Sequence, residues 1–120
     1  MISALVQTIM ECLEEAEMST PERPWQYTKL QPRGAFVSTL TVLKELESNN
    51  LISVHRDISS NDRWWANLEY LGEELLRVLR SGSLRIKLEK RLMADPNAVS
   101  VHTVSELANN VLSDEANDGD

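Results

Sequence analysis

One helical pattern followed directly by two strand-like runs constrains the fold of this chain most. Residues 35 to 48 have a polar face and, at helical spacing, an apolar face made of Phe36, Leu40, Leu43 and Leu46. This helix is predicted to end at Asn49 and Asn50, because asparagine adopts the left-handed conformation of a helix end at small cost. Residues 51 to 56 and 64 to 68 favour strands, and the turn-rich segment between them predicts a β-hairpin.

Further helices are predicted on both sides of this unit. Residues 2 to 17 carry an apolar stripe, and the prolines after them predict a short strand or an irregular connector at residues 25 to 28. Helical patterns cover residues 69 to 80 and 84 to 94, with a glycine suited to the first end and a serine suited to the next start. Residues 103 to 106 fit a capping box before a last helix. The predicted fold is mainly α with a small β-hairpin.

The chain is long enough to bury one core. It has 120 residues, 42% of them apolar, so we predict a single domain over residues 1 to 113 and a disordered acidic tail over residues 114 to 120. The apolar runs are short and the N-terminal segment is acidic, so neither a bilayer-spanning helix nor an export signal is expected. Cys12 is the only cysteine, which indicates a core position and a reducing, cytoplasmic location.

Charge is distributed unevenly along the chain. The formal net charge is -7, and residues 114 to 120 hold four acids and no base. A basic cluster between residues 77 and 91 contains Arg77, Arg80, Arg85, Lys87, Lys90 and Arg91. These side chains are predicted either to touch phosphates or to pair with acids of the first helix, within the chain or across a dimer. We expect a homodimer held by the apolar stripes of the first and last helices.

Two segments carry a resemblance to known proteins. Residues 37 to 52, VSTLTVLKELESNNLI, resemble the recognition-helix region of bacterial winged-helix regulators, and residues 68 to 76, LEYLGEELL, resemble the segment after their wing. Over residues 2 to 112 the chain is similar to a winged-helix family of unknown function common in phages and prophages, with Asn50 in place of the usual turn glycine. The resemblance implies a winged helix-turn-helix with additional C-terminal helices and a role in transcription regulation.

A DNA-binding regulator would use the exposed face of the helix over residues 35 to 48 and the hairpin. The candidate DNA-binding residues are Arg33, Ser38, Thr39, Thr41, Lys44, Arg56 and Arg63. Glu45 lies on the same face and would repel phosphates unless it accepts a hydrogen bond from a cytosine amine. The precedent of the fold makes this regulator the leading hypothesis.

Protein contact is the alternative hypothesis. Strand alternation sends one indole of Trp64 and Trp65 inward and the other outward, and an exposed indole is a typical interface anchor. Arg77 and Arg80 complete the candidate protein interface. The negative charge balance favours this reading, in which the chain is an adaptor or an inhibitor of a host system.

Catalytic and cofactor signatures are missing from the sequence. His55 and His102 are far apart, there is no second cysteine, and no zinc-binding spacing occurs. The four glycines are scattered singly, which excludes the P-loop and the dinucleotide fingerprint. We therefore expect a binding protein with no catalytic residues, no metal and no cofactor, rather than an enzyme.

Overall fold

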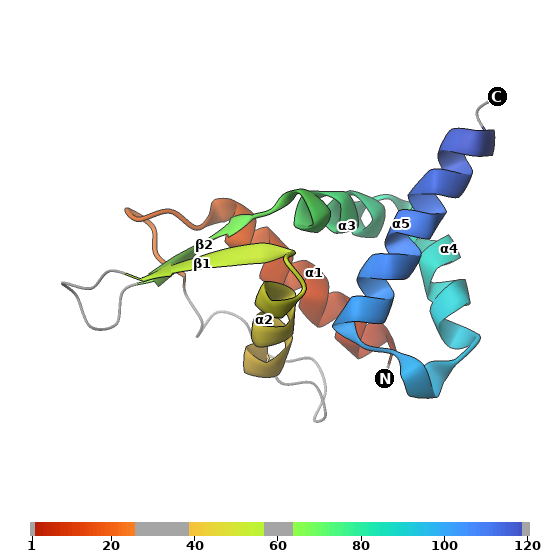
Figure 1. The fold of residues 1–120 in the computed structure, drawn as a ribbon, viewed down its shortest axis with the longest axis horizontal. Helices are drawn as coiled ribbons and strands as arrows, with labels where there is room; N and C mark the ends of the chain where they lie inside the picture. The colour runs from red at the N-terminus through yellow and green to blue at the C-terminus, as the bar shows by residue number, and fades with distance from the viewer. Residues whose placement is uncertain (1, 26–38, 57–63, 119–120) are drawn as a thin grey trace.

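The computed structural model describes residues 2–25, 39–56 and 64–118 (Figure 1). Its elements are α1 (Ile2–Met18), α2 (Thr39–Ser48), β1 (Ile52–Arg56), β2 (Trp64–Leu68), α3 (Tyr70–Arg80), α4 (Gly82–Met93), the short 3-10 helix η2 (Pro96–Ala98) and α5 (Val101–Asp118). The prediction of a mainly helical fold with a small hairpin is confirmed. Residues 26 to 28 of the expected connector and 35 to 38 of the expected helix lie outside the described residues. No helix of the described part is both long and apolar enough to span a bilayer.

Helix α1 is the central element of the core. It contacts α2, α3, α4 and β2, and Figure 1 shows it running behind the other elements. Five side chains of its apolar stripe are at most 1% exposed: Val6, Ile9, Cys12, Leu13 and Ala16. On α5, Val101, Val104, Ala108 and Val111 are likewise at most 1% exposed, and Leu107 and Leu112 are partly buried against the same core. The two stripes on which we expected a homodimer to form are therefore packed inside one chain and lend that expectation no support.

The hairpin is antiparallel and one of its edges is partly covered. Val54 pairs with Ala66, and Arg56 pairs with Trp64. The chain after α1 runs along β2, where the backbone N–H of Trp25 donates to the Trp64 carbonyl oxygen at 2.9 Å. The Ala66 N–H donates to the hydroxyl oxygen of Ser19 at 3.0 Å. These bonds satisfy backbone groups of β2 that an uncovered edge strand would expose.

The turn between α2 and β1 follows the prediction made from the two asparagines. Asn50 has a φ of 63°, the only positive φ of a non-glycine residue among those described. The next residue, Leu51, donates its N–H to the Leu46 carbonyl at 2.9 Å, so an otherwise unpaired carbonyl of the last helical turn is satisfied. The left-handed residue turns the chain directly from helix into hairpin.

Two predicted helix starts are displaced in the structure. Ser81 caps α4 by accepting a hydrogen bond from the Leu84 N–H at 3.4 Å, so Gly82 begins α4 rather than ending the helix before it. Ser100 caps α5 by accepting from the Thr103 N–H at 3.2 Å. The predicted capping box over residues 103 to 106 is therefore wrong, because both of its ends lie inside α5.

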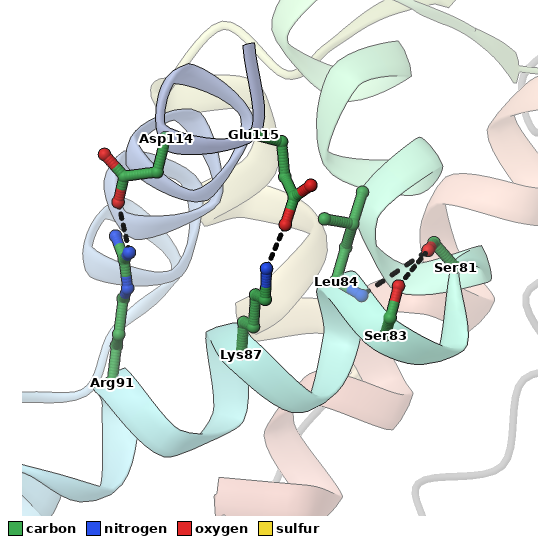
Figure 2. A network of polar contacts seen from close by, with 7 residues as sticks. All are labelled: Ser81, Ser83, Leu84, Lys87, Arg91, Asp114 and Glu115. Atoms are coloured by element: carbon green, nitrogen blue, oxygen red, sulfur yellow. Dashed lines mark hydrogen bonds and ion pairs between the residues drawn. The ribbon is translucent and has the colours of Figure 1, made fainter. Parts of the chain in front are cut away.

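The acidic end of the chain also differs from the prediction of a disordered tail. Residues 114 to 118 continue α5, while residues 119 and 120 lie outside the described part. The physical reason is visible in Figure 2, where Asp114 contacts Arg91 and Glu115 contacts Lys87. The cations of α4 thus neutralise acids that would otherwise repel one another at the end of the helix.

Candidate binding site

A hollow of about 220 Å³ lies between α2 and the hairpin, and we call it the α2–hairpin hollow. Its lining residues are Leu40, Leu43, Lys44, Glu47, Val54, Arg56 and Trp64. The first four come from α2, which contacts β1, and Figure 1 shows α2 beside the two strands. The other three point the same way because they occupy alternate positions of paired strands. The described lining of the hollow therefore combines apolar side chains with two cations and one carboxylate.

Helix α2 is rotated relative to the prediction. Its buried residues are Thr39, Val42, Leu43 and Leu46, which follow the spacing of a single helical face. Leu40, predicted to lie in the core with Leu43 and Leu46, is instead 45% exposed and lines the α2–hairpin hollow. Val42 is buried in its place, so the predicted apolar face of α2 is wrong at Leu40.

The rotation also changes the set of candidate DNA contacts. Thr39 is only 3% exposed, and its hydroxyl has no hydrogen-bond partner among the described residues. It faces the interior and is not placed to touch DNA, contrary to the prediction. Thr41 and Lys44 are exposed, as predicted, and Lys44 lines the hollow. Three other candidates, Arg33, Ser38 and Arg63, lie outside the described residues.

The two tryptophans of β2 lie on opposite faces of the hairpin, as strand alternation predicted. Trp64 packs against the core and stacks on the buried Trp25, with ring centroids 5.2 Å apart. Trp65 stacks on His55 at 5.7 Å on the other face. There the Asn67 amide nitrogen lies 2.9 Å from Nε2 of His55. Only Trp64 belongs to the α2–hairpin hollow, and both indoles are partly exposed.

Arg77 and Arg80, predicted as interface residues, are paired within the chain. Arg80 makes ion pairs with Glu17 at 2.7 Å and with Glu14 at 3.5 Å. The hydrogen bond from Arg80 lowers the pKa of Glu17 from its ordinary value. Arg77 pairs with Glu74 at 3.7 Å. For Arg80, the alternative that pairs the basic cluster with acids of the first helix within one chain is therefore confirmed.

A second hollow, of about 340 Å³, lies where the end of α1 approaches α3. Its lining residues are Glu17, Leu68, Glu73, Leu76, Arg77 and Arg80. Two carboxylates, of Glu17 and Glu73, and two guanidinium groups, of Arg77 and Arg80, line it, so the charges of the described lining balance. This hollow offers no concentrated charge of either sign to a ligand.

The described residues contain no arrangement suited to a metal or to thiol chemistry. No group of three or more His, Cys, Asp or Glu residues that could hold a metal ion is found in them. The thiol of Cys12 is fully buried, and this burial raises its pKa to about 12. A thiol with so high a pKa is protonated at neutral pH and is a poor nucleophile.

Sequence reasoning found three members of the α2–hairpin hollow, Lys44, Arg56 and Trp64, but assigned them to two different functions. It missed Leu40, which was placed in the core, and Val54, which was not singled out. Strand alternation could have placed Val54 beside Arg56, since both face the same way in β1. No protein-family profile, curated protein or solved structure matches the chain.

Proposed function

We propose that this chain is a non-enzymatic binding protein that holds a segment of another protein in the α2–hairpin hollow. The observation that carries the proposal is the exposure of Leu40, 45%, in a hollow that also contains Val54 and Trp64. A partner that covers an exposed leucine beside a tryptophan buries apolar surface, which is favourable because these side-chain carbons lose no hydrogen bonds to water. The single buried cysteine is in keeping with a cytoplasmic location.

The charges around the hollow indicate the chemistry of the segment it would accept. Lys44 and Arg56 are both exposed and outnumber Glu47, the one acid among the described lining residues. Arginine and tryptophan are also the residue types most enriched at energetically important interface positions. The best-fitting ligand is therefore a protein segment with an apolar side chain flanked by carboxylates.

Quantitative affinity capture with matched variants tests this function. Leu40→Ser removes the apolar contact, and Lys44→Gln with Arg56→Gln removes the cations. Met93→Ser, which changes a methionine that is 66% exposed on α4, is the control. A partner lost from both hollow variants and retained by the control would support the proposal. Retention of every captured protein by the hollow variants would contradict it.

A DNA-binding regulator is the second candidate function. It is favoured by one observation, that Lys44 of α2 and Arg56 of the hairpin line the same hollow, as a helix and wing contacting one duplex would require. This reading predicts micromolar or tighter binding to duplex DNA that weakens steeply with salt and in the Lys44→Gln/Arg56→Gln variant. Absence of binding at about 50 mM salt would exclude it.

A further inference from the structure

The last two turns of α4 present a basic surface that is separate from the α2–hairpin hollow. Lys87, Lys90 and Arg91 share one flank of the helix, because residues three and four apart are neighbours on a helical surface. Lys87 and Arg91 contact Glu115 and Asp114, which reach across from the end of α5 (Figure 2). The Lys90 side chain is exposed and has no ion pair or hydrogen bond with any described residue.

The groups that contact this surface in the chain itself are carboxylate oxygens from the C-terminal end of α5. Residues 114 to 118 read DEAND, so they carry acids and amides but no apolar side chain larger than that of alanine. Lys87 and Arg91 hold these carboxylates through charged hydrogen bonds. Phosphates present the same kind of oxygen acceptor to lysine and arginine, at regular intervals along a backbone.

These contacts are placed so that they can open without unfolding the chain. The helices α4 and α5 are held together by buried side chains, among them Leu88 and Leu92 of α4 and Val104 and Val111 of α5. Asp114 lies three residues beyond Val111, which is fully buried. All four charged side chains are 37% to 54% exposed, and ion pairs of this kind contribute only about 0 to 1 kcal/mol each.

We propose that Lys87, Lys90 and Arg91 form a binding surface for the phosphate backbone of duplex nucleic acid, and that the acidic end of α5 competes for it. A duplex would displace two weak carboxylate contacts and gain the entropy of released counterions. The chain's own acids thus compete with phosphates for Lys87 and Arg91 and lower the affinity of the surface for the duplex. The surface recognises charge rather than sequence, because it contacts phosphates only.

Salt-dependent binding of a labelled 20-base-pair duplex of random sequence tests the proposal in the full-length chain. The variant Asp114→Asn/Glu115→Gln removes the competing charges and should bind about tenfold more tightly than the wild type. Its slope of log affinity against log salt should stay close to the wild-type value, since Lys87 and Arg91 contact phosphates in both complexes once the duplex has displaced the carboxylates. The control Glu22→Gln/Glu69→Gln makes the same change in net charge at two exposed acids away from α4 and should leave affinity and slope unchanged.

A second set of proteins shows whether the gain arises at α4. Adding Lys87→Gln and Arg91→Gln to the Asp114→Asn/Glu115→Gln variant should abolish the gain. Circular dichroism melts verify folding, and Asp114→Ser/Glu115→Ser provides an independent removal of the same charges. The proposal is overturned if the control gains as much affinity, if the gain survives loss of Lys87 and Arg91, or if a labelled decaglutamate peptide binds the unmasked surface as tightly as the duplex.

Discussion

Gly72 of α3 lies against the backbone of Leu51 so closely that a Cβ atom at residue 72 would stand 2.0 Å from the Leu51 carbonyl oxygen. That carbonyl also accepts a hydrogen bond from the Glu69 N–H at 3.0 Å, which fixes the start of α3 against the start of the hairpin. Only glycine permits this approach, because any side chain would force two backbones apart.

Gly72→Ala is therefore expected to lower the free energy of unfolding by about 1 to 3 kcal/mol or more, as overpacking against rigid backbone does. Gly82→Ala is the matched control, since a Cβ there meets no atom within 4 Å and alanine favours the helix by up to about 1 kcal/mol. Urea denaturation of the wild type and of the two variants measures both changes in the free energy of unfolding. Equal stabilities of the two variants would contradict the close contact.

The rotation of α2 predicts different costs for two leucines of the same helix. Leu46 is fully buried, so Leu46→Ala should destabilise the fold by about 2 to 5 kcal/mol through lost burial and a cavity. Leu40 is 45% exposed, so Leu40→Ala should cost under about 1 kcal/mol. Urea unfolding midpoints give both values. A large loss of stability in Leu40→Ala would show that Leu40 lies in the core, as predicted from the sequence.

The hydrogen bond from Ala66 to Ser19 predicts a stability effect outside the hydrophobic core. Ser19 is 4% exposed, so Ser19→Ala leaves a buried backbone N–H without its acceptor and should cost about 1 to 3 kcal/mol. Ser48→Ala is the control, because the Ser48 hydroxyl is exposed and donates only to the Lys44 carbonyl of its own helix. Thermal melts should show a lower midpoint for Ser19→Ala alone.

The contact between Glu17 and Arg80 predicts a pH dependence of defined sign. The hydrogen bond from Arg80 lowers the pKa of Glu17, so the folded state favours the carboxylate. Its stabilising effect is present above the pKa of the unfolded chain and is lost as the pH falls through the folded-state pKa. Carboxyl-detected NMR titration should show the Glu17 pKa rising in Arg80→Gln and staying near the wild-type value in Arg77→Gln. An unchanged Glu17 titration in Arg80→Gln would show that the pair does not persist in solution.

The order of elements could be predicted because each depends on local sequence. Apolar spacing identified the helices, and the Asn49–Asn50 stop placed the turn into the hairpin within a residue of its observed position. The side of α2 that faces the core could not be predicted in the same way. Threonine is small enough to be buried, and whether Thr39 or Leu40 turns inward depends on how α2 packs against α1 and β1, which are distant in sequence.

The candidate site was only partly predictable for the same reason. Lys44 and Arg56 were recognised as exposed cations, but their meeting in one hollow depends on the contact between α2 and β1. The helical end of α5 was not predicted, because a segment with several acids and no base is expected to be disordered through charge repulsion. Their partners, Lys87 and Arg91, lie more than twenty residues earlier and come close only once α4 and α5 pack together.

The central position of α1 has a consequence for how the chain acquires its core during synthesis. The ribosome completes α1 before any of the elements that cover it, and the last of these, α4, ends at Met93. At about 5 to 20 residues per second, the stripe of α1 stays uncovered for several seconds after it is made. The core can therefore close fully around this stripe only after α4 has been synthesised.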